Sequence, residues 1–215
     1  MDYLSERKRL VDALVCEGYL KTQKVVDAML KVPRELFVPE EIRESAYADC
    51  PLPIGGGQTI SAPHMVAIMT EKLQLEVDSI VLEVGSGSGY QAAVIAEIAK
   101  NGFVYTIERV PSLVGYAKNN LSCCGLRNVE VIPSDGTLGF KEKAPYDRII
   151  VTAAAPRIPK ALVEQLKDDG LLLIPVGDRF LQNLIEVRKE KGKIVERNHG
   201  GCVFVPLIGL DGWKQ

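Results

Sequence analysis

Short apolar runs alternate with amphipathic stretches from about residue 79 onward. The runs are near-continuously apolar, which is typical of parallel strands that are covered on both faces. They occupy residues 79–85, 103–108, 129–134, 147–153 and 170–177. Stretches with helical spacing of apolar positions lie between them, at 90–100, 111–123 and 159–167. This alternation predicts an α/β fold with a doubly wound, mostly parallel, Rossmann-like sheet.

The two ends of the chain follow other patterns. Apolar positions at helical spacing predict two helices before residue 33, with Thr22 as N-cap of the second and Pro33 at its end. We therefore expect residues 1–50 to form an N-terminal helical cap. Residues 183–200 contain a Lys-Gly-Lys turn between two strand-like runs, which predicts an antiparallel C-terminal hairpin. Because no Ser/Gly-rich linker follows the cap, we expect it to belong to one domain with residues 51–215.

Composition excludes several classes of protein. The 215 residues carry a net charge of −2, which argues against binding of nucleic-acid phosphates, and 6% aromatic residues argue against base stacking. No apolar run approaches the roughly 20 residues that cross a bilayer, and no apolar stretch follows the charged start. The five cysteines and two histidines show no zinc-site spacing. We expect a cytoplasmic protein with reduced thiols, no metal and no membrane or nucleic-acid partner.

The sequence LEVGSGSGY, residues 82–90, is the strongest chemical signal. Gly85, Gly87 and Gly89 fall where a strand turns into a helix. Without Cβ atoms, a ligand can approach the backbone there and reach free N–H groups of the helix N-terminus. A dinucleotide fingerprint G-x-G-x-x-G requires glycine at position 90, where this chain has Tyr90. The motif therefore favours a different nucleoside-containing ligand.

Two acidic residues follow the next strands. Glu108 ends the second strand, 23 residues after Gly85, where a carboxylate can accept hydrogen bonds from both ribose hydroxyls. Asp135, in Ser-Asp-Gly after the third strand, could accept from an adenine amino group. Each acid alone is equally well explained as a loop cap or a solvated carboxylate. Because three such features follow successive strands of a sheet that binds ligands at its carboxyl edge, they predict a nucleoside site.

Residues 51–64, PLPIGGGQTISAPH, predict an irregular loop of the kind that carries function. Ser61 fits two interpretations: an N-cap for a helix with Pro63 in its first turn, or a functional hydroxyl. A helix N-terminus disfavours a protonated His64. Since the sequence shows neither an acid beside this histidine nor a G-x-S-x-G elbow, we reject a serine hydrolase.

Several motifs together resemble one enzyme family, protein-L-isoaspartate (D-aspartate) O-methyltransferases. They are LEVGSGSGY, VYTIER, the Ser-Asp-Gly turn, GQTISAPHMVAIM and the ending CVFVPLIG, and the resemblance covers the chain from about residue 15. Two positions depart from the family pattern: Ser86 stands where Thr is common, and Ser134 where Gly is common. The resemblance implies a methyltransferase sheet and methyl transfer from S-adenosylmethionine to the free carboxylate of L-isoaspartyl residues in damaged proteins and peptides. The methyl ester then closes to a succinimide, which starts repair, and S-adenosylhomocysteine is the second product.

The resemblance also implies a site. Ser61 is the expected catalytic residue, and the expected substrate-binding residues are Ser61, His64, Val205 and Ile208. The expected cofactor-binding residues are Gln58, Thr59, His64, Glu83, Gly85, Ser86, Gly87, Gly89, Glu108, Arg109, Asp135 and Gly136. A carboxylate with a pKa near 4 is ionised at pH 7, so alignment and exclusion of water replace a strong base.

Two other functions remain open at this point. One is a methyltransferase for a small molecule or another carboxylate, and the other is a binding protein that has lost activity. The GQTISAPHM motif argues against the first, and intact Ser61, Glu108 and Asp135 argue against the second. We expect the protein to be a monomer.

Overall fold

The computed structural model describes residues 2–214, which form a seven-stranded sheet in the order β5-β4-β3-β6-β7-β8-β9 and a separate two-stranded sheet. The strands of the large sheet are β3 (Ile80–Val84), β4 (Phe103–Glu108), β5 (Val129–Pro133), β6 (Tyr146–Val151), β7 (Leu166–Gly177), β8 (Gln182–Glu190) and β9 (Lys193–Cys202). Strands β3 to β7 pair in parallel, whereas β8 and β9 add antiparallel at one edge. The predicted α/β fold with a C-terminal hairpin is confirmed.

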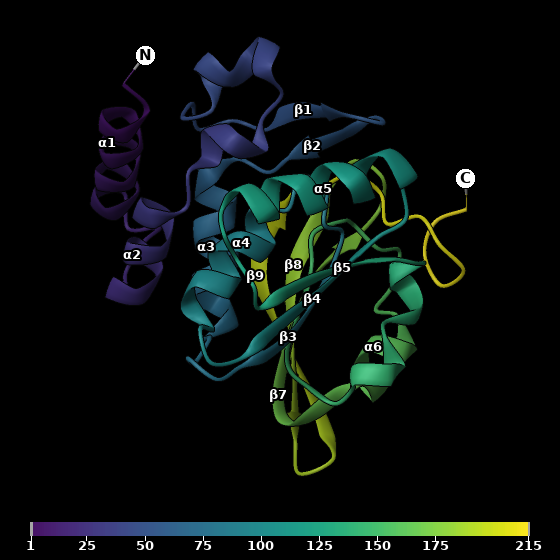
Figure 1. Ribbon diagram of the computed structural model, residues 1–215. Helices are drawn as coiled ribbons and strands as arrows, with labels where there is room; N and C mark the ends of the chain where they lie inside the picture. Colours follow the sequence, from purple (N-terminus) through teal and green to yellow (C-terminus); the bar gives the residue numbers. More distant parts are fainter. Residues whose placement is uncertain (1, 215) are drawn as a thin grey trace.

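Helices cover both faces of this sheet (Figure 1). They are α3 (Pro63–Leu73), α4 (Tyr90–Ile98), α5 (Pro111–Cys123) and α6 (Lys160–Glu164). Alternate strand residues point to opposite faces, so Leu171 and Leu173 of β7 join the core under α3 to α5, while Leu172 and Ile174 join the core under α6. Every residue of α4 is buried, because α2 of the N-terminal cap packs over its outer side.

The N-terminal cap holds α1 (Tyr3–Cys16), α2 (Gln23–Lys31) and two 3-10 turns, η1 (Arg34–Phe37) and η2 (Glu40–Ser45). Thr22 precedes α2 as predicted, but its side chain does not cap that helix. Its hydroxyl instead donates to the Glu71 carboxylate on α3, at 3.0 Å, and so ties α2 to α3. The cap is therefore joined to the body by polar contacts as well as by packing.

Two boundaries differ from the prediction. Residues 51–64 are less irregular than predicted, because β1 (Leu52–Gly55) and β2 (Gln58–Ile60) form an antiparallel hairpin. Its turn contains Gly56 and Gly57 at φ of +59° and +71°, as a tight hairpin requires. Helix α6 is also shorter than predicted, since the Gln165 carbonyl accepts the Tyr146 N–H and draws the chain into β7.

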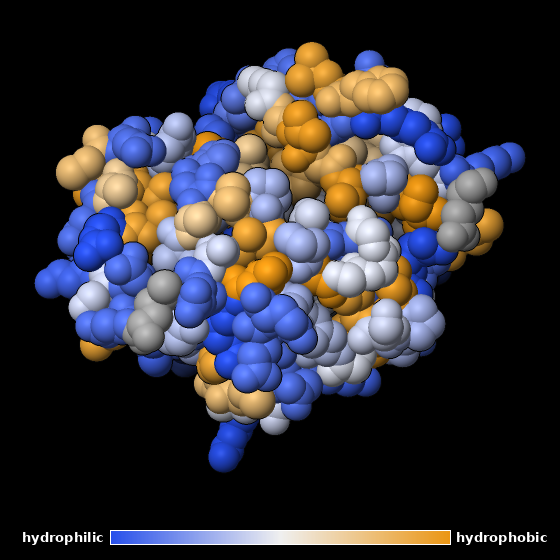
Figure 2. Space-filling model, turned by 90° about the horizontal axis from the view of Figure 1, so that it is seen from above, coloured by the Kyte–Doolittle hydropathy of each residue, from blue (hydrophilic) through white to orange (hydrophobic). Residues whose placement is uncertain are grey.

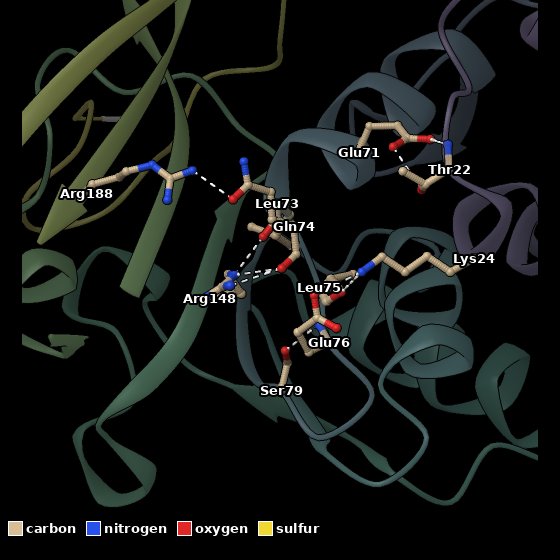
Figure 3. Close-up of polar contacts among 10 residues, drawn as sticks. All are labelled: Thr22, Lys24, Glu71, Leu73, Gln74, Leu75, Glu76, Ser79, Arg148 and Arg188. Atoms are coloured by element: carbon tan, nitrogen blue, oxygen red, sulfur yellow. Dashed lines mark hydrogen bonds and ion pairs between the residues drawn. The ribbon is translucent and has the colours of Figure 1, made fainter. Parts of the chain in front are cut away.

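Side chains from three other elements hold the C-terminal end of α3 (Figure 3). Gln74 has a left-handed backbone at φ 50°. Arg148 of β6 donates to the Leu73 carbonyl at 2.7 Å and to the Gln74 carbonyl at 3.0 Å. Arg188 of β8 donates to the Gln74 side-chain oxygen at 2.9 Å, and Lys24 of α2 reaches the backbone of the following residue. Arg148 and Lys24 thus satisfy backbone carbonyls that a helix end otherwise leaves unpaired.

Within residues 2–214, no helix is long and apolar enough to cross a membrane.

Candidate active site

A cleft opens at the carboxyl edge of the parallel strands. Seen from above, hydrophobic side chains gather around a hollow on this face (Figure 2). The lining comes from β2, the loop before α3, the turn between β3 and α4, the ends of β4 and β6, and the C-terminal segment 205–208. A sheet of this kind binds ligands at this edge, so the location agrees with the topology.

Most of the predicted site residues meet in this cleft. Those that line it are Gln58, Thr59, Ser61, Glu83, Gly85, Ser86, Gly87, Glu108, Arg109, Gly136, Val205 and Ile208. Three predicted residues, His64, Gly89 and Asp135, do not line it. The cleft also has lining residues that the sequence motifs did not predict, including Val66, Gln91, Thr152 and Ala153. Thr152 and Ala153 follow β6, so their place after a strand at the carboxyl edge was the available signal.

The glycine turn packs closely against its neighbours and lines the cleft with Gly85 and Gly87. Gly85 has φ +101°, and a Cβ there would lie 2.5 Å from the Thr152 hydroxyl, which donates to the Gly85 carbonyl at 2.6 Å. Glycine is required at position 89 for a different reason. It is the N-cap of α4 at φ +89°, and a Cβ would lie 3.1 Å from Leu121 of α5. Gly85 therefore shapes the cleft, while Gly89 lets two helices pack.

Glu108 is held in a fixed orientation at the end of β4. Its side chain is buried, and its two carboxylate oxygens accept the backbone N–H groups of Gly87 at 2.9 Å and Val110 at 2.8 Å. A carboxylate has about four lone-pair sites, so two remain for a ligand. The carboxylate at this strand end is therefore preorganised to accept hydroxyl groups.

Glu83 is a fully buried acid with an incomplete set of partners. Its Oε2 accepts the Thr106 hydroxyl at 2.5 Å, while Oε1 has no hydrogen-bond partner within the described residues. Burial raises the pKa of Glu83 to about 8, and the nearby Glu108 carboxylate contributes in the same direction. A carboxyl group of this kind is ready to pair with a cationic group that enters the cleft.

Asp135 does not enter the main cleft but lines an adjacent hollow with Ser134, Leu210 and Trp213. One of its oxygens accepts the Thr137 N–H and hydroxyl, and the other accepts the Leu210 N–H at 2.8 Å. Partial burial opposes ionisation, but these donors together lower the pKa of Asp135. The carboxylate thus fixes the C-terminal segment onto the strand ends, a role that the adenine prediction did not include.

Ser61 is not the N-cap of α3. The helix begins at Pro63, and its N-cap is Ala62 with an extended backbone, whose side chain makes no cap bond. The capping interpretation was therefore wrong, because the chain enters the helix one residue later than the pattern suggested. Ser61 is half-buried and lines the cleft, while its carbonyl accepts a hydrogen bond from Arg34 at 2.8 Å. Its hydroxyl is left for the cleft.

His64 points to the N-terminal cap. Its Nδ1 lies 3.0 Å from both carboxylate oxygens of Asp49, which also accepts the His64 backbone N–H at 2.9 Å, and its ring lies 5.6 Å from that of Tyr19. The expectation that no acid stands beside His64 was wrong, since Asp49 reaches it from 15 residues away in the sequence. The ring is outside the cleft lining, so it does not complete a nucleophile and base pair with Ser61.

The C-terminal segment closes one side of the cleft through its backbone. The Ala154 N–H donates to the Val205 carbonyl and the Leu207 N–H donates to the Ala154 carbonyl, both at 2.8 Å. These bonds hold Val205 and Ile208 against the strand ends. No group of three or more His, Cys, Asp or Glu residues that could hold a metal ion occurs in residues 2–214.

The sheet order, the glycine turn and the acids at successive strand ends define a nucleoside-binding α/β enzyme with the fold of S-adenosylmethionine-dependent methyltransferases. The sequence profile of the family "Protein-L-isoaspartate(D-aspartate) O-methyltransferase (PCMT)" matches residues 5–212. The chain belongs to this family. The resemblance seen in the sequence motifs is thereby confirmed.

Individual relatives agree with this family. A protein-L-isoaspartate O-methyltransferase from Pyrococcus horikoshii is 58% identical over 210 residues, which cover 97% of this chain and 95% of the relative. One from Methanopyrus kandleri is 57% identical over 212 residues, covering 97% and 94%. A crystal structure of the Plasmodium falciparum enzyme in complex with S-adenosyl-L-homocysteine matches with a TM-score of 0.85 and 31% identity, covering 94% of this chain and 98% of the other.

Proposed function

We propose that the cleft transfers the methyl group of S-adenosylmethionine to the free carboxylate of L-isoaspartyl residues in damaged proteins and peptides. The family supports this reaction, and so does the S-adenosylhomocysteine complex of the Plasmodium relative. One observation carries the proposal: residues 58–61 of the hairpin loop and residues 83–88 of the glycine turn line the same cleft. The proposed nucleoside-binding turn and the half-buried Ser61 therefore line the same cleft.

The cleft fits the cofactor on its own geometry. We assign the ribose hydroxyls to Glu108, whose carboxylate is already oriented by two backbone N–H groups. We assign the amino group of the methionine part to Glu83, whose buried Oε1 lacks a partner. Gly85 and Gly87 line the cleft, and we propose that the cofactor lies against their backbone. When bound, S-adenosylmethionine supplies a methyl group on a positively charged sulfur.

The other cofactor assignments fall into two groups. Gln58, Thr59, Arg109 and Gly136 line the cleft, and we propose that they close over the cofactor. Ser86 also lines it, with its hydroxyl 2.6 Å from that of Thr106. We propose that His64, Gly89 and Asp135 support the site from outside the cleft, through the contacts described above.

For the substrate, we propose that the Ser61 hydroxyl donates to the isoaspartyl carboxylate and orients it. A carboxylate with an ordinary pKa near 4 is ionised at pH 7, so no side chain has to remove a proton. A neutral donor orients the oxygen without holding it as tightly in the ground state as a direct ion pair would. Val205 and Ile208 form the side of the cleft along which the peptide lies. We propose no metal, so a chelator should leave the rate unchanged.

We further propose that the chain acts as a cytoplasmic monomer and binds neither nucleic acid nor membranes. We also treat the N-terminal cap and residues 51–215 as one domain, because α2 packs on α3 and α4. Sedimentation of the purified protein, with and without substrate peptide, tests the monomer.

The reaction is tested with labelled S-adenosylmethionine and two peptides that differ only in an isoaspartyl or a normal aspartyl linkage. We expect label in a base-labile ester on the isoaspartyl peptide alone. Equal labelling of both peptides would favour a general carboxylate methyltransferase. Cofactor binding without any transfer would favour a binding protein.

A further inference from the structure

Arg34, in the N-terminal cap, is completely buried, with 0% of its surface exposed. Its Nε donates to the Ala46 carbonyl and its Nη2 donates to the Ser61 carbonyl, both at 2.8 Å. The guanidinium carbon lies 4.9 Å from the centre of the Tyr90 ring. The third nitrogen, Nη1, is buried and has no hydrogen-bond partner within the described residues.

This environment is unusual for a cation. Arg7, another buried arginine of the N-terminal cap, pairs with the Glu35 carboxylate at 3.0 Å. Within residues 2–214, Arg34 forms no such ion pair, and its polar partners are two carbonyls and Tyr90, through its ring and its hydroxyl. The carboxylate of Asp49 acts on it electrostatically but is hydrogen-bonded to His64. A guanidinium keeps its proton in proteins, so the positive charge remains here without a paired anion.

Stability alone does not account for an arginine at this position. A buried charge without a paired opposite charge is costly, and buried ionic groups can often be replaced by well-packed apolar residues without loss of stability. The unpaired Nη1 adds the cost of an unsatisfied donor. The two carbonyls and the Tyr90 ring offset only part of the free-energy cost of burying this charge, since a cation over an aromatic face contributes modestly. A role beyond packing is therefore the better explanation.

The position of Arg34 indicates that role. Two of the groups that it contacts, Ser61 and Tyr90, both line the cleft, whereas Arg34 itself does not. Its positive charge therefore lies directly behind the part of the cleft that carries the Ser61 hydroxyl. This is where the proposed function places the substrate's negative charge.

We propose that Arg34 is a positioning residue for the isoaspartyl carboxylate, fixing Ser61 through its carbonyl and supplying a positive field behind Ser61 and Tyr90. The inference rests on the proposed function of the cleft. Because the guanidinium is set back behind its two neighbours, it attracts the carboxylate without forming the direct ion pair that would lower the reactivity of the attacking oxygen. The substrate completes the charge balance that the folded chain leaves open.

The test measures how strongly the enzyme prefers a charged substrate group. An isoaspartyl peptide is compared with the matching isoasparaginyl peptide, whose neutral amide makes it a competitive inhibitor and not a substrate. The preference is the ratio of the inhibition constant of the amide to the dissociation constant of the isoaspartyl peptide. This ratio reports on charge and is insensitive to a general loss of folded protein.

We expect Arg34→Met to lower the preference by about ten- to fiftyfold, the effect of a unit charge acting over several ångströms at an intermediate dielectric constant. Arg34→Gln should do the same and keeps one polar donor group, which provides a second neutral variant if the methionine variant does not fold. Arg34→Lys should keep most of the preference but lower kcat, because a single ammonium cannot bridge Ala46 and Ser61 in the same way. Affinity for S-adenosylhomocysteine should change by less than about twofold in all three variants.

Met29→Ala is the matched control, because Met29 is buried in α2 of the same N-terminal cap and carries no charge. It should lower the melting temperature and leave the preference unchanged. A neutral Arg34 variant that keeps the wild-type preference would overturn the inference, and so would a lysine variant that loses it as fully as methionine does. A wild-type enzyme that does not methylate the isoaspartyl peptide would instead overturn the proposed function.

Discussion

Arginine side chains donate to backbone carbonyls at both ends of helix α3, but the two ends differ in function. At the C-terminal end, Arg148 satisfies backbone carbonyls directly, supported by Arg188 and Lys24 (Figure 3). At the N-terminal end the N-cap residue Ala62 has no side-chain cap bond, Asp49 accepts only the His64 N–H among the backbone donors, and the arginine behind this end has an unpaired nitrogen within the described residues. Satisfied polar groups stabilise a fold, whereas unsatisfied ones beside a cleft indicate a missing ligand. Substitutions at the two ends should therefore separate stability from turnover.

The largest expected effect comes from the N-terminal end. Ser61→Ala should lower the methylation rate by about 10² to 10³, the upper range for removing one orienting donor from a desolvated site, because less charge develops here than at an oxyanion. The free energy of unfolding should change by less than about 0.5 kcal/mol, because Ser61 does not cap α3. Single-turnover rates at saturating S-adenosylmethionine, recorded with the melting temperature, check both parts. Ser61→Thr keeps the hydroxyl and should retain more activity than alanine.

A substitution on the cofactor side of the same cleft should lower the affinity for S-adenosylmethionine much more than the rate of methyl transfer. Glu108→Ala removes a buried carboxylate that two backbone N–H groups orient. Hydrogen bonds to a charged acceptor contribute roughly 1.5–3 kcal/mol, so affinity for S-adenosylmethionine should fall about ten- to hundredfold. Calorimetric titration measures this, and an unchanged affinity would remove Glu108 from the site.

Asp135→Ala, by contrast, should act mainly by loosening the C-terminal segment around Leu210.

A substitution at the C-terminal end of α3 should lower the stability of the protein and leave the methylation rate nearly unchanged. Arg148→Met keeps the aliphatic part of the side chain but removes the donors to the Leu73 and Gln74 carbonyls. We expect a loss of about 2 kcal/mol in the free energy of unfolding, or about 4–8 °C in melting temperature for a chain of this size. The rate per folded molecule should stay within about twofold of wild type. A large loss of rate without loss of stability would show that the two ends are not separate in function.

The effect that is spread over the widest range of conditions, and is smallest per unit of change, concerns the pH dependence of stability. The pKa of Glu83 is about 8 in the folded protein against an ordinary value of 4.5, so the native state binds more protons between these values. The free energy of unfolding of the cofactor-free enzyme should therefore fall as pH rises through this window, by at most about 1.4 kcal/mol per pH unit. Glu83→Gln removes the titration and should flatten the profile. Chemical denaturation from pH 5 to 8 compares the two, and identical slopes would contradict the assignment.

Local patterns in the sequence predicted much of this molecule. Apolar runs located the strands, and the glycine spacing located the turn at Gly85 and Gly87, because both depend on residues close in the sequence. The family motifs then indicated most of the cleft lining. The Ser61 interpretation was uncertain because a serine two residues before Pro63 fits a cap and a cleft equally well.

The missed features depend on contacts between distant segments. Asp49 reaches His64 across the start of α3, and Asp135 bonds to Leu210 from 75 residues away. Arg34 is one polar residue in the short turn after Pro33, and no periodicity distinguishes it from a solvated arginine. Only the packing of the N-terminal cap against α4 shows that it is buried next to Tyr90. Such sites follow from tertiary structure and not from local propensity.

The central claim is that the start of α3 orients an isoaspartyl carboxylate inside the cleft. It is tested most directly by single-turnover methylation of the isoaspartyl peptide and its aspartyl twin, using wild type, Ser61→Ala and Arg148→Met at saturating cofactor. The account predicts label on the isoaspartyl peptide alone, a rate lowered about 10² to 10³ by Ser61→Ala, and a rate within about twofold of wild type for Arg148→Met. A Ser61→Ala enzyme that methylates the isoaspartyl peptide at the wild-type rate would contradict it.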